Sequence, residues 1–328
     1  MKYKAYLFSL LFAFPVLSMA AGEADSLRLL QINRLQEQVD WVNPEAIRAY
    51  LNDTKSSLGD KTPELYQKLE ELETLLPQVR RHLSTDTTRR TIDEAQKLLD
   101  LKREILLANP LLDIDNILVA RYRLGNQART AMGPALGTSN ANYNSLFSSR
   151  RSGYDAEISR LSNLRGSIES RTIYKPEADV PLSDIQLHWD ADRLLFSSLD
   201  ENRHWQIYEI NTDGTGLHQK VVVDEPDLEF CDANYLPDGK VVATCNIGYN
   251  GVPCVHGDDV VANLVSYDPE TKNIRRLTFD QDGNWAPIVI PNGRLMYTRW
   301  EYTDLTHYFS RIVMHMNPDG TENKALYG

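Results

Sequence analysis

One arrangement of apolar and polar positions occurs three times between residues 185 and 327. Each copy reads as a short apolar strand, a tight turn, a β-rich strand, a longer loop, a strand, an Asp/Gly turn and a last strand. The first turns end at Arg193, Lys240 and Arg294, at sequence intervals of 47 and 54 (240−193; 294−240). Four strands in every ~40–50 residues are typical of β-propeller blades. The pattern therefore predicts three blades over residues 185–328.

The turns of these repeats have a shared chemistry. Residues 237–239 read Pro-Asp-Gly, in which Pro presets φ and Gly supplies a positive φ. The second turns, at 211–216, 268–271 and 317–321, are rich in Asn, Asp, Gly and Thr. These positions indicate tight connections at one end of every predicted blade.

In the segment before the repeats, apolar residues recur with the period of a helix instead of that of a strand. From about 24 to 108, apolar residues follow helical spacing, and Asn43-Pro44 and Thr62-Pro63 are typical of helix starts. Pro77 is expected to kink or end its helix, and Pro110 follows the last one. We expect a helical region over residues 21–110 that packs as a bundle or as a cap on the sheet domain.

Residues 111–184 form a transition segment. We expect strands at 117–123, 157–164 and 170–176, with an irregular loop between the first two. These strands make an additional, irregular blade or help to close a ring. The expected fold is mainly β with an α-helical N-terminal region, and its β-propeller is incomplete at about three to four blades, because ~4–8 are typical. The end at Gly328, directly after a predicted strand, favours a fragment of a longer protein.

The N-terminal segment 1–20 has the pattern of a secretory signal peptide. Lys2 and Lys4 precede an apolar run, and Ser18-Met19-Ala20 precedes the expected cleavage after Ala20 or Ala21. The apolar run is short for a membrane span. We expect a periplasmic or secreted protein that is not held in a membrane after cleavage.

Composition narrows the class of partner. The chain has 328 residues, of which 42% are hydrophobic and 25% charged, with a net charge of −11. Cleavage removes two lysines and no acid, so the mature charge is −13 (−11 − 2). An acidic chain disfavours nucleic acid and anionic membranes as partners.

The three cysteines are Cys231, Cys245 and Cys254. Export permits disulfides. Cys231 and Cys245 lie seven residues on either side of Asp238, so a hairpin closed there places them opposite each other. Cys254, in a loop nine residues after Cys245, is an alternative disulfide partner for Cys245. One cysteine stays unpaired within a monomer, and both pairings remain open.

The order of strands predicts one functional face, which we call the long-loop face. It carries the loops at 199–204, 246–262 and 300–309 and the crossings between blades at 223–232 and 280–286. The face is acidic and aromatic, and loops on a rigid scaffold commonly hold binding sites. The candidate ligand-binding residues are Asp280, Asp282, Trp285, Arg299, Trp300, Glu301, Tyr302, Asp304, His307 and Tyr308.

Metal binding is one kind of chemistry that suits this face. Carboxylates with histidine favour a divalent metal, and the candidate metal ligands are Cys254, His256, Asp258 and His307. The candidate residues of this face also have a structural interpretation, because propeller loops use Asp in turns and Trp in packing between blades. No H-E-x-x-H, Walker loop, G-x-S-x-G or C-x-x-C-H occurs in the chain. We therefore predict no covalent haem and no other cofactor. A divalent metal is the one group that these residues could still hold.

Several stretches resemble one family. Residues 231–239, 251–254 and 280–320, together with 106–123 and 185–210, are similar to proteins related to the hydrazine synthase alpha subunit, in its middle β-propeller domain. The turns also resemble the Asp-Gly repeats of TolB-type propellers. The resemblance covers 106–328, and its motifs are most specific at 280–320.

The resemblance implies an exported propeller whose relatives continue beyond Gly328. It does not imply haem chemistry, because the attachment motif is missing. We expect an exported propeller that binds a polar small molecule, a carbohydrate or a protein on the long-loop face. The alternative is a metal-assisted enzyme that uses carboxylates and His307 there, so enzymatic activity is left open.

Overall fold

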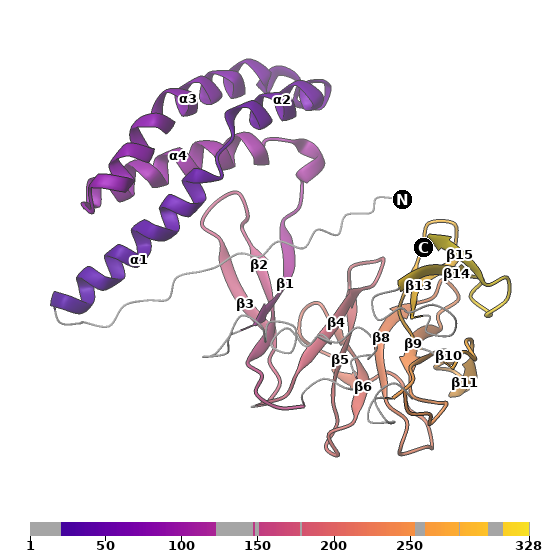
Figure 1. Ribbon diagram of the computed structural model, residues 1–328. Coiled ribbons are helices and arrows are strands. Elements are labelled where there is room, and N and C mark those ends of the chain that lie inside the picture. Colours follow the sequence, from indigo (N-terminus) through magenta and orange to yellow (C-terminus); the bar gives the residue numbers. More distant parts are fainter. Residues whose placement is uncertain are drawn as a thin grey trace. The chain divides into compact units, whose positions relative to one another are not determined.

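The protein divides into a helical unit and a strand unit. The computed structural model describes residues 21–122, 147, 151–177, 179–252, 260–281, 283–300 and 311–327. The helical unit holds the described residues up to 117 together with 162–169, and the strand unit holds the rest. Figure 1 shows the helices and the sheets of the two units.

The helical unit has four α-helices joined by short connections. They are α1 (Ala21–Asp40), α2 (Pro44–Leu58), α3 (Thr62–Thr85) and α4 (Arg89–Leu107), with short 3₁₀ turns η1 (Gly59–Lys61) and η2 (Pro110–Leu112). The side chain of Asn43 accepts a hydrogen bond from the Ala46 N–H at 3.1 Å, which caps α2 as the sequence predicts. The apolar stripes of the helices share one core.

Helix α3 differs from expectation at Pro77. It continues through this residue to Thr85, so of the two expected outcomes, a kink or an end, the end is wrong. Leu72, Leu76 and Val79 are buried around the proline in the core of the helical unit. Burial of this apolar face outweighs the backbone hydrogen bond that proline cannot donate.

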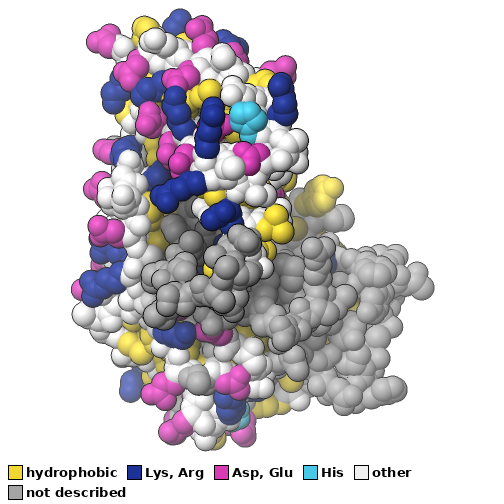
Figure 2. All heavy atoms as spheres, turned by 90° about the vertical axis from the view of Figure 1, so that its left-hand side faces the viewer, with side chains coloured by type: hydrophobic (Ala, Val, Ile, Leu, Met, Phe, Trp, Pro, Cys, Tyr) yellow, Lys and Arg dark blue, Asp and Glu magenta, His cyan; other side chains and the backbone are white. Residues whose placement is uncertain are grey.

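The surface of the helices carries both signs of charge. Figure 2 shows Lys and Arg side chains interleaved with Asp and Glu over the helices on the face in view. Several of these are cross-helix pairs, such as Lys97 with Glu71 at 2.8 Å. None of the helices among the described residues is both long enough and apolar enough to cross a membrane.

The strand unit consists of four sheets that follow one another in the chain. β1 (Asn116–Tyr122), β2 (Ala156–Ser162) and β3 (Glu169–Tyr174) form a three-stranded sheet. Three four-stranded antiparallel sheets follow, and each is composed of four consecutive strands. This establishes a mainly β protein with several antiparallel sheets and an α-helical N-terminal region.

The three four-stranded sheets correspond to the three sequence repeats. The first sheet contains β4 (Leu182–Leu187), β5 (Arg193–Leu199), β6 (Trp205–Asn211) and β7 (His218–Gln219). The second contains β8 (Phe230–Tyr235), β9 (Val241–Cys245), β10 (Asn263–Asp268) and β11 (Asn273–Arg276). The third contains β12 (Asn284–Val289), β13 (Leu295–Trp300), β14 (Arg311–Met316) and β15 (Lys324–Tyr327).

Successive sheets pack face to face. One apolar cluster joins Ile158 of the three-stranded sheet to Phe196 of the first four-stranded sheet. A second joins the first and second sheets, and a third joins Leu264 of the second sheet to Tyr297 of the third. The core is therefore a series of layers between neighbouring sheets.

The first strand of each four-stranded sheet contains a bulge. The register with the second strand shifts between Ser183 and Gln186, between Cys231 and Asn234, and between Trp285 and Ile288. The residues with positive φ in these bulges are Asp184 (50°), Asp232 (55°) and Ala286 (54°). A bulge bends its strand and re-aims the side chain at the extra position.

The bulge in β8 changes which residues face Cys231 and Cys245, so the expectation that these cysteines face each other is wrong. Cys231 pairs with Thr244, whereas Cys245 pairs with Phe230, so the two cysteines are not opposite each other. They lie in different apolar clusters, and both buried thiols are free in the structure. The shift of one residue sends the two side chains to opposite faces of the sheet. Cys254 lies outside the described residues.

Candidate functional site

Only part of the predicted ligand-binding set lies in the described structure. Asp280, Trp285, Arg299 and Trp300 are described. Trp285 belongs to strand β12 rather than to the crossing, because β12 begins at Asn284. The other candidates lie outside the described residues: Asp282, Glu301, Tyr302, Asp304, His307 and Tyr308, with the candidate metal ligands Cys254, His256 and Asp258.

Asp280 and Arg299 form an ion pair at the start of the third sheet. The Arg299 Nη1 atom lies 2.8 Å from Asp280 Oδ1, and each side chain is about one-fifth exposed. Asn284, which is fully buried and faces Arg299 across β12 and β13, donates from Nδ2 to Asp280 Oδ2 at 3.0 Å. This acid is therefore held by two neighbours at the long-loop end of the sheet.

The two candidate tryptophans have different environments. Trp300 is buried and packs against Val252 and Val261. Trp285 is half-buried, and the Arg311 guanidinium lies 5.1 Å from its ring centroid. Burial lowers the pKa of Arg311. Of the two rings, Trp285 presents more surface to a ligand.

Glu229, another acid of the predicted face, is held in a network. Its carboxylate pairs with Arg151 at 2.8 Å and accepts a hydrogen bond from the backbone N–H of Trp205 at 2.8 Å. The side chain of Glu229 is only 12% exposed. This residue therefore connects the second sheet to the beginning of β6.

The most distinctive group on the long-loop side is a pair of carboxyl groups, Asp184 and Asp232, which we call the carboxyl pair. Both occupy bulges near the start of the first strand, in consecutive sheets. The backbone N–H of Asp232 donates to Asp184 Oδ2 at 3.3 Å, and the two carboxyl groups contact each other. Both side chains are half-buried. The bulges thus bring two acids from separate repeats together.

Hydroxyl and amide groups surround the carboxyl pair. Thr244 Oγ1 donates to Asp232 Oδ2 at 3.0 Å, and the N–H of Ala286 donates to the same oxygen at 3.3 Å. Ser197 Oγ accepts from the N–H of Asp232 at 3.2 Å. Among the described residues, no basic side chain forms an ion pair with Asp184 or Asp232.

The electrostatics of the pair follow from its surroundings. Burial, followed by the neighbouring Asp232 carboxylate, raises the pKa of Asp184 well above its usual range. Two carboxylates in contact disfavour double ionisation. The pair is therefore suited to hold a proton, to attract a cation or to accept hydrogen bonds from a polar ligand.

Asp184→Asn tests this interpretation through pH. An acid whose pKa is higher in the folded state contributes stability below its unfolded pKa of about 4, and this contribution is lost as the pH rises through the folded pKa. We expect the variant to gain stability relative to the wild type as the pH rises from about 4 to 8, by about 1.4 kcal/mol for each pH unit in which only the folded state holds the proton. Urea unfolding across this range measures the difference.

The matched control is Asp213→Asn. Thr215 donates to Asp213 from its hydroxyl and its backbone N–H, and these bonds lower the pKa of Asp213. This variant should lose stability relative to the wild type at neutral pH and approach it in acid, the opposite trend. A difference between Asp184→Asn and the wild type that does not change with pH would contradict the assignment.

Sequence reasoning placed Asp232 on the acidic face but missed Asp184. A usable signal exists: Asp184, Asp232 and Ala286 follow one another at sequence intervals of 48 and 54 (232−184; 286−232), close to those of the basic turn residues. Alignment of the three repeats on these basic residues places the three bulge positions within one residue of one another (193−184 = 9; 240−232 = 8; 294−286 = 8). The described residues contain no group of three or more His, Cys, Asp or Glu side chains arranged for a metal ion.

Comparisons with known proteins give partial likenesses in fold. No family model matches the chain, and no curated protein matches it. A solved structure of Kuenenia stuttgartiensis hydrazine synthase is similar at 16% identity and a TM-score of 0.46, over 66% of this chain and 32% of that chain.

Two further structures are similar over about half or more of their own length. An oligogalacturonate lyase in complex with manganese has 12% identity and a TM-score of 0.42, over 66% of this chain and 51% of that one. TolB from Acinetobacter baumannii has 14% identity and a TM-score of 0.36, over 73% and 59%. The chain spans less than two thirds of each of these three proteins. The expected relation to hydrazine synthase is therefore supported only as a partial similarity in fold. The comparisons do not show the family to which this chain belongs.

Proposed function

We propose that the strand unit forms consecutive blades of a β-propeller, and that the chain is an exported protein that binds a polar ligand on its long-loop face. Support for the blades comes from the sheets themselves. Each four-stranded sheet is a meander of consecutive strands, and each packs face to face on the next. This succession is how blades follow one another around a propeller axis.

The carboxyl pair is the observation that carries the binding proposal. Asp184 and Asp232 come from adjacent sheets, at the long-loop end of their first strands, and no basic side chain among the described residues neutralises them. Ser197 and Thr244 add hydroxyl groups beside them. A ligand with hydroxyl or ammonium donors would complete the hydrogen bonding of this group.

The ligand class follows from these acceptors and from the acidic chain. A polar small molecule, a carbohydrate or a polar segment of a protein fits, whereas nucleic acid does not, because the mature charge of −13 (−11 − 2) repels phosphates. Export rests on the signal-like segment 1–20. We place the protein in the periplasm or outside the cell, as a haem-free relative of the hydrazine synthase alpha subunit middle domain.

A metal-assisted enzyme is the second candidate. Two carboxyl groups in contact also suit a divalent cation, which prefers oxygen ligands. His307, which lies outside the described residues, is the further ligand that the sequence predicts for this function. This function requires a stoichiometric metal, which the binding function does not.

The experiment is carried out on mature protein recovered from the exported fraction, with its N-terminus sequenced. Elemental analysis and haem absorbance come first. Thermal shift is then measured with sugars, polyols, amino acids and the divalent ions Ca²⁺, Mg²⁺, Mn²⁺ and Zn²⁺, for the wild type and Asp232→Asn. Occupancy of a site at about 100 times its Kd adds roughly 2.7 kcal/mol of stability.

The binding function predicts no haem and no stoichiometric metal. It also predicts at least one polar organic compound that raises the melting temperature of the wild type and not of Asp232→Asn. A stoichiometric metal that Asp232→Asn loses would support the metal-assisted enzyme instead. The binding proposal fails if no compound stabilises the wild type, or if all effective compounds stabilise both proteins equally.

A further inference from the structure

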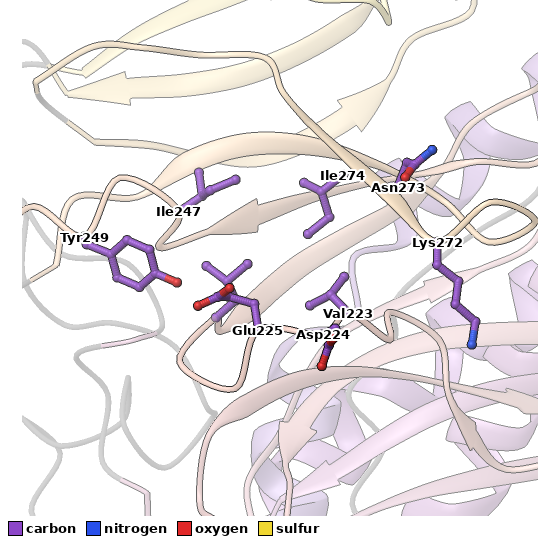
Figure 3. A pocket seen from close by; sticks show the side chains of 9 residues that line it. Val223, Asp224, Glu225, Ile247, Tyr249, Lys272, Asn273 and Ile274 are labelled. Atoms are coloured by element: carbon purple, nitrogen blue, oxygen red, sulfur yellow. The ribbon is translucent and has the colours of Figure 1, made fainter.

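A surface groove lies on the second sheet and includes neither residue of the carboxyl pair. It has a volume of about 400 Å³. Three segments line it: the crossing from the first to the second sheet, the chain after β9 and the start of β11 (Figure 3). The lining residues are Val223, Asp224, Glu225, Leu228, Ile247, Tyr249, Lys272, Asn273 and Ile274.

The floor of the groove is apolar. Leu228 is buried in the core between the first and second sheets, and Val223, Ile247 and Ile274 pack against the same core while remaining partly exposed. These side chains are held by the fold and do not need to rearrange to accept an apolar group. The groove therefore offers a preformed apolar surface.

One end of the groove is acidic and aromatic. Tyr249 is 56% exposed, and Figure 3 shows its phenol directed towards the carboxylate of Glu225. The pKa of Tyr249 is raised, first by burial and then by the carboxylates of Glu225 and Asp227. Among the described residues, neither Glu225 nor Asp224 is in an ion pair.

The backbone conformation of Tyr249 sets where its side chain leaves the chain at this end. Its φ is 50°, a region that non-glycine residues rarely occupy, and its N–H donates to the Asn246 carbonyl at 2.8 Å in a tight turn. The turn therefore projects an aromatic ring beside a carboxylate that lacks a basic partner. A ring face and a carboxylate together are the groups that recognise an organic cation.

Lys272 lies at the other end of the groove. Figure 3 shows its side chain extending away from Tyr249, on the far side of Ile274. A positively charged ligand is therefore attracted to the Tyr249 end and repelled from the Lys272 end. The groove therefore has a negatively charged end at Glu225 and a positively charged end at Lys272, and these charges set the orientation of a charged ligand.

We propose that this groove binds an organic ammonium ion, with its charged nitrogen between Glu225 and the Tyr249 ring and its apolar body on Val223, Ile247 and Ile274. The ammonium group belongs either to a free amine or to a lysine side chain of a partner protein. Six of the nine lining residues belong to the loops of the long-loop face, but the groove shares no residue with the carboxyl pair. The Asp232→Asn variant that tests the proposed function therefore does not test this groove, and the two proposals can fail separately.

The test is a titration of the mature full-length chain followed by NMR. Benzylamine is the cationic probe, and benzyl alcohol is the neutral probe of nearly the same shape. We expect benzylamine to bind about tenfold more tightly than benzyl alcohol, and Glu225→Gln to remove this preference. Glu201→Gln, the same change at an exposed acid of the loop before β6, is the control and should leave the affinity unchanged.

Two further arms complete the design. Lys272→Ala should leave the affinity for benzylamine unchanged or strengthen it, because it removes a like charge. N-acetyl-lysine methylamide tests the second source: binding at least as tight as that of benzylamine assigns the groove to a lysine side chain, and weaker binding assigns it to a free amine. The proposal is overturned if benzyl alcohol binds as well as benzylamine, if Glu225→Gln retains the preference or if Lys272→Ala weakens binding.

Discussion

Trp205→Ala should destabilise the strand unit by about 3–5 kcal/mol, the usual cost of deleting a buried aromatic side chain. Trp205 is fully buried at the start of β6 and packs with Phe147, Leu199 and Cys231. Its removal leaves a cavity near the place where the first and second sheets meet. Urea unfolding followed by intrinsic fluorescence from the remaining tryptophans measures the loss.

Two variants control this experiment. Trp189→Ala removes the same side chain at a position that is 46% exposed, so we expect a loss of about 1 kcal/mol or less. Trp205→Phe should cost less than Trp205→Ala, because it keeps most of the volume and removes a buried indole N–H that has no hydrogen-bond partner among the described residues. Equal losses at positions 189 and 205 would contradict the packing role of Trp205.

Leu69→Ala should cost the helical unit about 2–5 kcal/mol. Leu69 is fully buried on α3, in the core that the four helices share. We expect the loss of helical circular dichroism to move to lower temperature. The fluorescence transition should move little, because Trp189, Trp205, Trp285 and Trp300 lie in the strand unit and only Trp41 lies among the helices.

Leu30→Ala is the control for Leu69, because Leu30 is 55% exposed on α1. It should change neither transition by more than about 0.5 kcal/mol. If Leu69→Ala shifts both transitions together, the chain unfolds as one cooperative body and the expectation of two separate transitions is wrong.

The sequence predicts the repeats well because their turns are local. Asn211 donates from Nδ2 to the hydroxyl of Thr215 at 3.0 Å, and Asn317 makes the same bond to Thr321 at 2.9 Å. In each turn the partners are four residues apart, so the pattern of residue types records the geometry directly. The strands on either side follow from their apolar alternation.

The bulges and the carboxyl pair could not be predicted in the same way. Whether Cys231 faces Cys245 depends on a slip of one residue, and symmetry about Asp238 contains no sign of it. Asp184 lies one residue before the first predicted repeat, and its partner Asp232 belongs to the next repeat and to another sheet. The spacing of the repeats marks these positions as equivalent, but the contacts between them depend on how complete sheets pack, which spacing and composition do not specify.

The hydrogen bonds between the bulge positions all run in the same direction along the series of sheets. The N–H of Asp232 donates to Asp184, and the N–H of Ala286 donates to Asp232, so the second sheet offers a donor to the first sheet and a carboxylate to the third. A duplicate of the second repeat would carry both halves of this link and would join its parent without new mutations. The third sheet keeps the donor but has alanine in place of the acid. It therefore ends this series of links, and any neighbour on its other side must be attached by different chemistry.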